Sequence, residues 1–122
     1  LNNQDKVDWC YFKGAANGET FAATDDATAK TVFAILTHED WTVRNETRFA
    51  MASTTASEFD AISDGDIIEF EAWTSGNSNI NNLSVDDVVL FKLQDGRLGY
   101  IKVVDTFSRG DRIKIDVIVQ VP

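Results

Sequence analysis

Three strand-like segments follow one another at the C-terminal end of the chain and leave few arrangements open to it. They span residues 88–93, 97–107 and 111–121, and the last alternates between aliphatic odd positions and mostly polar even positions. Strict alternation predicts a β-strand with one buried face. Short turns between such segments predict antiparallel neighbours. We therefore expect an α+β fold whose mixed or antiparallel sheet ends in a C-terminal three-stranded meander, with one or two packed helices.

The dipeptide Asp95-Gly96 predicts the register of the first hairpin of this meander. A two-residue Asp-Gly loop favours a type I′ turn, in which both central residues have positive φ. The turn would place Leu93 opposite Leu98 and Leu90 opposite Ile101. Further apolar residues would then gather on the second face, covered by a helix, a neighbouring domain or a second copy of the chain. They are Val89, Phe91, Leu93, Leu98, Tyr100 and Ile118.

The aliphatic residues of the last strand should face the core. A shift of the register by one residue would move every side chain of a strand to the other face. The odd-numbered residues of the last strand are therefore expected on the same face as Ile101 and Val103. On this prediction Val117 and Val119 are hidden from water.

The corner before the last strand contains the tripeptide RGD at positions 109–111, which matches the integrin attachment signal. Parity of the two strands places Phe107 opposite Ile113 and leaves residues 108–112 as a loop. Gly110 provides the left-handed residue that such a loop usually requires. Turn chemistry therefore explains the tripeptide without a cell-attachment role.

The first two thirds of the chain predict two helices and further strands. Thr24 or Asp25 can cap a helix with an apolar stripe of Ala29, Val32, Phe33 and Leu36. Thr55 and Glu58 have capping-box spacing at the start of a second helix, in residues 55–62. Strands are predicted at residues 6–12, 47–52 and 67–73, with a polar loop at 74–82.

Composition bounds the domain organisation and the partners. Residues 1–122 suffice for a single α+β domain with its own core, and no linker divides them. Twenty acidic and eleven basic residues give a net charge of −9, which disfavours nucleic acid as a partner. No apolar run approaches the roughly 18–20 residues that cross a bilayer. The chain begins at Leu1 with polar residues, so we expect the native start to lie elsewhere, in a processed precursor, a shortened chain or a module of a longer protein.

Residues with catalytic chemistry are few. Cys10 and His38, the only residues of their types, suggest a nucleophile–base dyad, but Cys10 lies in an apolar strand and His38 follows a helix. Nucleophile-elbow, phosphate-loop, zinc-protease and dinucleotide motifs are all missing from the sequence. The enzyme alternative is a carboxylate- or metal-dependent hydrolase that uses Asp60, Asp64, Asp66 and His38.

Two binding chemistries remain open. The carboxylates of Asp60, Asp64 and Asp66 could ligate calcium, although they lack EF-hand spacing and a solvated turn also explains them. Sugar rings stack on aromatic faces while amides bind their hydroxyls, although aromatic residues equally suit a core. The residues that suggest glycan binding are Trp9, Tyr11, Trp41, Trp73 and Tyr100, with the asparagine-rich loop 75–82.

Segments spread over most of the chain match one known pattern. The motif W-x-x-R-N-x-T-[KR]-F is matched by Trp41, Arg44, Asn45, Thr47 and Phe49, and residues 59–62 match F-D-A-I. The motif L-x-x-G-D-V-I-x-F-K-x-x-x-G-K-x-G-L-I-K-V is matched by Leu83, Asp87, Val88, Phe91, Lys92, Gly96, Gly99, Ile101, Lys102 and Val103. The chain departs from the pattern at Asp86, where glycine is usual, and near Ala23, where a Ser-Pro pair is frequent.

These motifs resemble a module found in secreted lipoproteins of Bacteroidota. The resemblance implies an exported domain, commonly lipid-anchored through an upstream cysteine and following another, often immunoglobulin-like, domain. It implies no particular activity. We therefore expect the C-terminal module of a longer exported protein, located outside the cytoplasm at the cell surface or outer membrane through an upstream lipid anchor.

The first motif contains the candidate ligand contacts Trp41, Arg44, Asn45 and Arg48, since hydrogen-bonding side chains lie near an aromatic ring. The alternative places Trp41 in the core and uses Arg44 and Asn45 to hold the loop backbone. The leading hypothesis is a non-enzymatic binding or assembly module without metal or cofactor. Its partner would be a glycan, a neighbouring domain or a surface protein.

Overall fold

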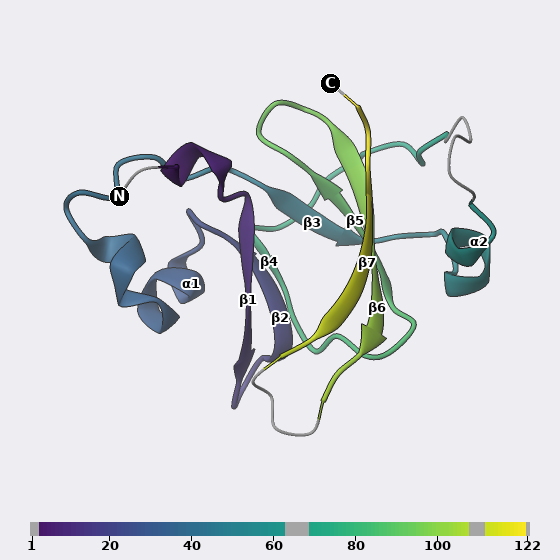
Figure 1. Ribbon diagram of the computed structural model, residues 1–122, viewed down its shortest axis with the longest axis horizontal. Helices are drawn as coiled ribbons and strands as arrows, with labels where there is room; N and C mark the ends of the chain where they lie inside the picture. Colours follow the sequence, from purple (N-terminus) through teal and green to yellow (C-terminus); the bar gives the residue numbers. More distant parts are fainter. Residues whose placement is uncertain (1–2, 63–68, 108–111, 122) are drawn as a thin grey trace.

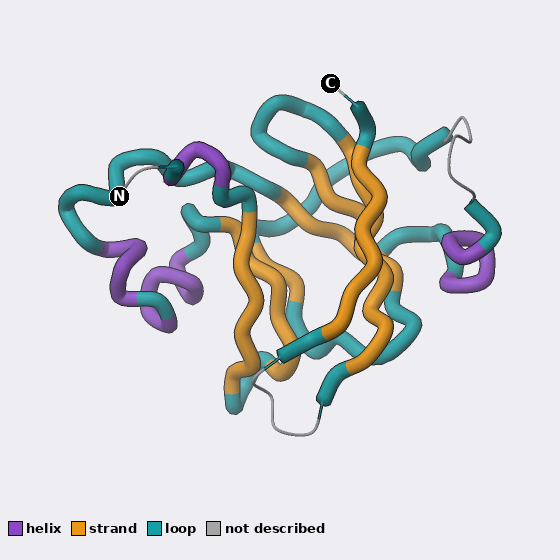
Figure 2. Tube along the Cα trace, viewed as in Figure 1, coloured by secondary structure: helices purple, strands orange, loops and turns teal. Residues whose placement is uncertain are grey.

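Two antiparallel sheets form the centre of the fold, and short helices lie at its periphery (Figures 1 and 2). The computed structural model describes residues 3–62, 69–107 and 112–121. The sheet orders are β1-β2-β4 and β3-β5-β6-β7, so the expected α+β class with a C-terminal meander is confirmed. The elements are η1 (Gln4–Lys6), β1 (Trp9–Gly14), β2 (Gly18–Ala23), α1 (Ala27–Val32), η2 (Ala34–Thr37), β3 (Arg48–Met51), α2 (Ala56–Asp60), β4 (Asn79–Ile80), β5 (Val88–Lys92), β6 (Leu98–Asp105) and β7 (Lys114–Val119).

The two sheets enclose one main core. Phe49 of β3 exchanges backbone hydrogen bonds of 2.8 and 2.9 Å with Asn77, which lies two residues before β4. This bridge joins the edges of the sheets and brings their apolar faces together. The buried residues of the main core come from both sheets and are Phe21, Ala23, Phe49, Leu83, Val89, Phe91, Leu93, Ile101 and Val103.

The β1–β2 hairpin is an element that the sequence analysis did not predict. Gly14 pairs with Gly18, and Gly18 has a φ of 62° at the end of the turn. The dipeptide Asn17-Gly18 is a hairpin signal, because asparagine and glycine tolerate positive φ. β2 places Phe21 at the centre of the core, where it is fully buried.

The register of the β5–β6 hairpin differs from the prediction by one residue. Leu90 pairs with Tyr100, not with Ile101, and Val89 pairs with Ile101. The loop has three residues, which lie between Leu93 and Arg97. The N–H of Leu93 donates a hydrogen bond of 2.9 Å to the carbonyl oxygen of Arg97. A three-residue loop needs a left-handed residue at its end, and Gly96 supplies it with a φ of 93°.

This register changes which side chains of β5 enter the core. Val89, Phe91 and Leu93 belong to the main core and do not lie on the second face of the meander, where they were expected. The second face has Val88 and Leu90 in their place, together with Tyr100, Leu98 and Ile118, which lie there as predicted. Phe59 of α2 packs on these residues, so a helix covers this face at least in part.

The β6–β7 pairing has the predicted parity, but part of β7 is not buried. Ile101 pairs with Val117 and Val103 with Ile115, odd with odd. Val117 is 43% exposed and Val119 is 40% exposed, so the expected burial of these valines is wrong. β7 is the outer strand of its sheet, and the main core contacts this strand at Ile115.

The corner between β6 and β7 is described in part. The register shifts between Val103 and Asp105, and the ladder ends at the pair Asp105–Lys114, so the expected Phe107–Ile113 pair does not belong to it. The RGD tripeptide at 109–111 lies outside the described residues.

The first helix is shorter than predicted and has a different cap. Asp26, rather than Thr24 or Asp25, accepts a hydrogen bond from the N–H of Ala29 at 3.0 Å. The helix ends at Val32, which is 46% exposed, because Phe33 has extended backbone angles. Ala29 and Leu36 of the predicted stripe are nevertheless buried, against Phe12 and Ala22.

The second helix has the predicted capping box. The strand predicted after it, at residues 67–73, does not form in residues 69–73, the part that the structure describes. The Thr55 hydroxyl accepts from the N–H of Glu58, and the Glu58 carboxylate accepts from the N–H of Thr55. Residues 69–73 have no strand pairing, and β4 forms inside the predicted loop 74–82 instead. Phe70 stacks on Tyr100 at 4.9 Å between ring centroids, so side-chain packing holds this segment.

Candidate functional site

Arg44 and Asn45 hold backbone carbonyl groups of the protein itself. Arg44 donates from Nε and Nη2 to the carbonyl oxygen of Leu36, at 3.1 and 2.6 Å. Asn45 is buried, and its Nδ2 donates to the carbonyl oxygen of Asp5 at 2.9 Å and to Oδ1 of Asp8 at 3.0 Å. Arg44 and Asn45 therefore hold the backbone, as expected if this motif has a structural role rather than a ligand-binding role.

Trp41 and Arg48 lie in different environments. Trp41 packs against the small cluster that includes Phe12 and Leu36, and its buried Nε1 has no hydrogen-bond partner in the described part of the chain. Arg48 donates to both carboxylate oxygens of Asp25, at 2.9 and 2.7 Å. The hydrogen bond to Asp25 raises the pKa of Arg48. The four candidate contacts therefore do not form one continuous patch.

Asn45 and Arg48 do line two adjoining surface hollows. The hollow at Asn45 has a volume of about 620 Å³ and the hollow at Arg48 a volume of about 210 Å³. They adjoin because Leu93 and Gln94 line both. We call the two hollows together the polar groove; it is lined by Asp5, Lys6, Asp8, Val43, Asn45, Glu46, Arg48, Trp73, Lys92, Leu93, Gln94, Asp95 and Arg97.

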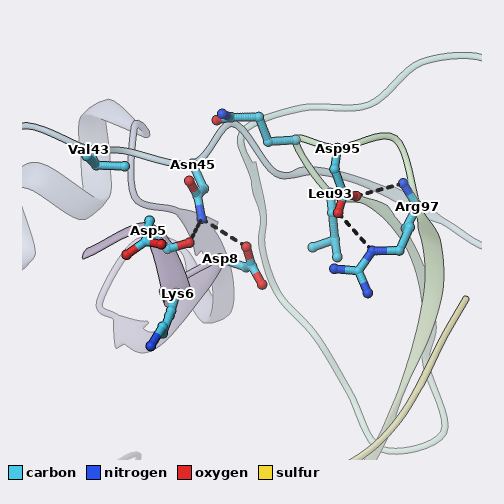
Figure 3. A pocket seen from close by; sticks show the side chains of 9 residues that line it. Asp5, Lys6, Asp8, Val43, Asn45, Leu93, Asp95 and Arg97 are labelled. Atoms are coloured by element: carbon cyan, nitrogen blue, oxygen red, sulfur yellow. Dashed lines mark hydrogen bonds and ion pairs between the residues drawn. The ribbon is translucent and has the colours of Figure 1, made fainter. Parts of the chain in front are cut away.

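One wall of the groove consists of η1 and the segment before β3. The side-chain oxygen of Gln4 accepts hydrogen bonds from the N–H groups of Thr42 and Val43, at 2.8 and 3.0 Å. Asn45 adds its bond to the carbonyl oxygen of Asp5. Two segments about forty residues apart are thereby held side by side, as Figure 3 shows for Asp5 and Asn45.

The other wall is the β5–β6 hairpin loop. Asp95 accepts from the backbone N–H of Arg97 at 3.1 Å and from its Nε at 2.9 Å, as Figure 3 shows. The backbone hydrogen bond is the main cause of the lowered pKa of Asp95. Gln94 accepts from the N–H of Glu46 at 2.9 Å and so ties this loop to the opposite wall.

The polar groove is lined by both hydrogen-bond donors and hydrogen-bond acceptors. Carboxylates of Asp5, Asp8 and Asp95 accept hydrogen bonds, while Lys6 and Arg97 donate them. The smaller hollow adds Trp73, Arg48 and other polar side chains. A mixture of acceptors and donors, together with one aromatic ring, suits a ligand that carries several hydroxyl groups.

The residues of the enzyme alternative are not brought together where the structure describes them. His38 follows η2 and is exposed, and its Nδ1 accepts from the N–H of Asp40 at 3.1 Å. Asp60 ends α2 and binds Nζ of Lys102 at 2.8 Å. The helices α1 and α2 lie on opposite sides of the sheets, and η2 directly follows α1 (Figure 1). His38 and Asp60 are therefore far apart.

The remaining residues of the calcium and hydrolase hypotheses, Asp64 and Asp66, lie outside the described residues. Among residues 3–62, 69–107 and 112–121, the acidic, histidine and cysteine side chains form no cluster that could hold a metal ion.

Cys10 should react slowly in the native protein. Burial, with a smaller contribution from the charge of Asp26, raises the pKa of its thiol from the ordinary 9.0 to about 11. Two pKa units lower the thiolate fraction near neutral pH about 100-fold. We expect iodoacetamide at pH 8 to modify Cys10 about 100-fold more slowly in the folded chain than in urea, as measured by mass spectrometry. Equal rates in both states would contradict this environment.

Most residues of the polar groove had no signal in the sequence. Lys6, Gln94 and Arg97 were not singled out, and Asp95 was noted solely as a turn residue. The groove assembles from segments around residues 5–8, 43–48, 73 and 92–97, which are distant in the sequence. Turn chemistry can locate the hairpin loop, but it contains no information on what the loop faces.

Comparisons of the chain with known protein families, with curated proteins and with solved structures find no match. In the described part of the chain, no helix has the length and hydropathy that crossing a membrane requires.

Proposed function

We propose that the chain is a non-enzymatic, extracytoplasmic binding module of a bacterial surface lipoprotein, and that its polar groove holds a glycan. The motifs around Trp41, residues 59–62 and Leu83 support the cell-surface part of the proposal through their resemblance to such lipoproteins. The groove supports the binding part.

The observation that carries the proposal is the arrangement of both groove walls. Asn45 and Gln94 use their amides to hold these walls, so the backbone of both walls is in place before any ligand arrives. Pre-positioned groups lose little conformational entropy on binding. Vicinal hydroxyls of a sugar can donate to Asp5 or Asp8 while accepting from Lys6 or Arg97. Trp73 provides an apolar surface for a second ring in the smaller hollow.

A glycan array followed by isothermal titration calorimetry tests the proposal. We expect the full chain to bind at least one neutral oligosaccharide, and Arg97→Ala to weaken that binding about tenfold, since a hydrogen bond to a charged group contributes about 1.5–3 kcal/mol. Lys6→Ala should weaken it similarly, because both cations line the larger hollow.

Lys13→Ala is the matched control. Lys13 is exposed and lies in β1 next to the β1–β2 turn, and it does not line the groove. The Lys13→Ala variant should bind the oligosaccharide with the same affinity as the wild type. A chain that binds no glycan on the array, or groove variants that bind as tightly as Lys13→Ala, would overturn the proposal.

A further inference from the structure

β7 is an open edge of the four-stranded sheet. The strand order β3-β5-β6-β7 leaves it with β6 as its one strand neighbour in the described part of the chain (Figure 1, yellow). It continues a sheet whose two inner strands, β5 and β6, are largely buried. An edge strand presents unpaired backbone groups that can bind another strand.

The register shows which backbone groups face the open edge. The N–H of Gln120 donates to the carbonyl oxygen of Leu98 at 2.9 Å, and Ile118 pairs with Tyr100. Residues of an antiparallel strand alternate between bonding one neighbour and bonding the other. Even-numbered residues of β7 therefore bond β6, and the N–H and carbonyl groups of Val117 and Val119 point outward.

The described side chains at this edge combine exposed valines with exposed charges. Val117 and Val119 are 43% and 40% exposed on one face. Lys114 and Asp116 are exposed on the other face. β-branched residues favour strand pairing, whereas charged residues such as Lys114 oppose it unless the partner strand neutralises them.

The charges of Lys114 and Asp116 favour one register for the pairing of β7 with a second copy of itself. In antiparallel pairing of two copies of β7 centred on Asp116, the two Asp116 carboxylates would lie opposite each other and repel. If the pairing were centred on Val117, the charged Lys114 and Asp116 would lie opposite the uncharged Gln120 and Ile118 of the second copy. If the pairing is centred on Ile115, Lys114 of each copy lies opposite Asp116 of the other copy. The twofold symmetry then gives two ion pairs.

We propose that β7 pairs antiparallel with β7 of a second copy of this chain, centred on Ile115, so that the two four-stranded sheets become one continuous sheet. Ile113 then lies opposite Val117 of the second copy and covers part of its exposed side chain. The outward backbone groups of β7 gain partners at the same time. This proposal does not depend on glycan binding.

Sedimentation equilibrium of the full chain measures the assembly. We expect a dimer at 0.15 M salt, where the Debye length of about 8 Å screens the repulsion between two acidic copies. Val117→Pro removes an outward N–H and should raise the dimer dissociation constant at least tenfold, because proline is tolerated on a free edge but cannot donate. At concentrations so low that both proteins are monomeric, the thermal unfolding of Val117→Pro should remain close to that of the wild type. Ile118→Pro, which removes an N–H that bonds β6, should instead lower the unfolding temperature.

A charge exchange tests the register and the identity of the partner. Lys114→Asp and Asp116→Lys should each weaken the dimer about tenfold, because each turns two attractive pairs into repulsive ones. The double variant restores opposite charges across the interface only if β7 pairs with its own copy about Ile115, and it should return to the wild-type dissociation constant. Circular dichroism must show that it is folded, because the exchange also sets like charges opposite Asp105 and Lys102 of β6. A monomeric wild type, a dimer unaffected by Val117→Pro, or a double variant as weak as the single variants would overturn the proposal.

Discussion

Gly99→Ala is expected to lower the free energy of unfolding by about 3 kcal/mol, at the upper end of the range for overpacking a core. Gly99 of β6 lies directly opposite Phe91 of β5, and the ring of Phe91 covers it. A Cβ atom at this position would meet Cε1 of Phe91 at 2.5 Å and the carbonyl oxygen of Ile118 at 2.7 Å. Phe91 is 1% exposed and cannot move without displacing the main core. Urea denaturation followed by tryptophan fluorescence measures the change.

Gly14→Ala is the matched control for this substitution. Gly14 also lies in a strand, but a Cβ atom there would have its nearest contact at 3.6 Å, which is ordinary van der Waals contact. Its unfolding free energy should stay within about 0.5 kcal/mol of the wild type. If the two variants are equally stable, Phe91 is not packed on Gly99 and the β5–β6 register described above is wrong.

Asp26→Ala is expected to cost about 3 kcal/mol of stability, because one carboxylate serves three partners. It accepts from the N–H of Ala29 at the start of α1, from the hydroxyl of Ser78 and from Nδ2 of Asn79. The residue is 3% exposed, so its loss leaves polar groups of Ser78 and Asn79 without that partner. The same urea titration measures the loss, and a cost of less than about 1 kcal/mol would contradict the role of Asp26 as the link between α1 and β4.

The pH dependence of stability isolates the charge of Asp26. Burial alone would raise its pKa, but the hydrogen bonds from Ser78, Ala29 and Asn79 outweigh burial and hold the pKa below the ordinary 3.8. A carboxyl whose pKa is lower in the folded state stabilises it above the unfolded pKa and loses this contribution as the pH falls through the folded pKa. The wild type should therefore lose stability below about pH 4. Asp26→Asn should show less of this loss, and the two curves should converge in acid.

The C-terminal meander and the second helix were predictable because their signals are local. The capping box of Thr55 and Glu58 forms as expected, since both partners lie within one helical turn. The odd-with-odd pairing of β6 and β7 follows from alternation in both strands. The hairpin at Asn17-Gly18 had a similar local signal, which the sequence analysis did not use.

The register of β5 shows where local signals stop. An Asp-Gly dipeptide is compatible with a two-residue loop and also with a three-residue loop that ends in glycine. The structure has the longer loop, which sets Phe91 opposite Gly99 and beside the core phenylalanine Phe49. That choice depends on the space that Gly99 leaves for a ring, and the space exists once the strands are packed.

The candidate site could be predicted to a smaller extent than the fold. The first motif directed attention to Asn45 and Arg48, and both line the polar groove. Trp41 and Arg44 belong to the same motif but contact the cluster around Leu36. Neighbours in an irregular segment can point in different directions, so adjacency in the sequence does not place side chains in one site.

The amino-acid order alone determined that this chain ends in three antiparallel strands, which residues of β7 share a face, and where its second helix begins. These properties depend on alternation, turn residues and capping groups a few positions apart. Tertiary structure alone decided which face of β5 enters the core, that Val117 and Val119 stay exposed, and that residues near positions 5, 45 and 95 meet in a groove. Burial and contact between distant segments are properties of packing, and packing depends on the whole chain at once.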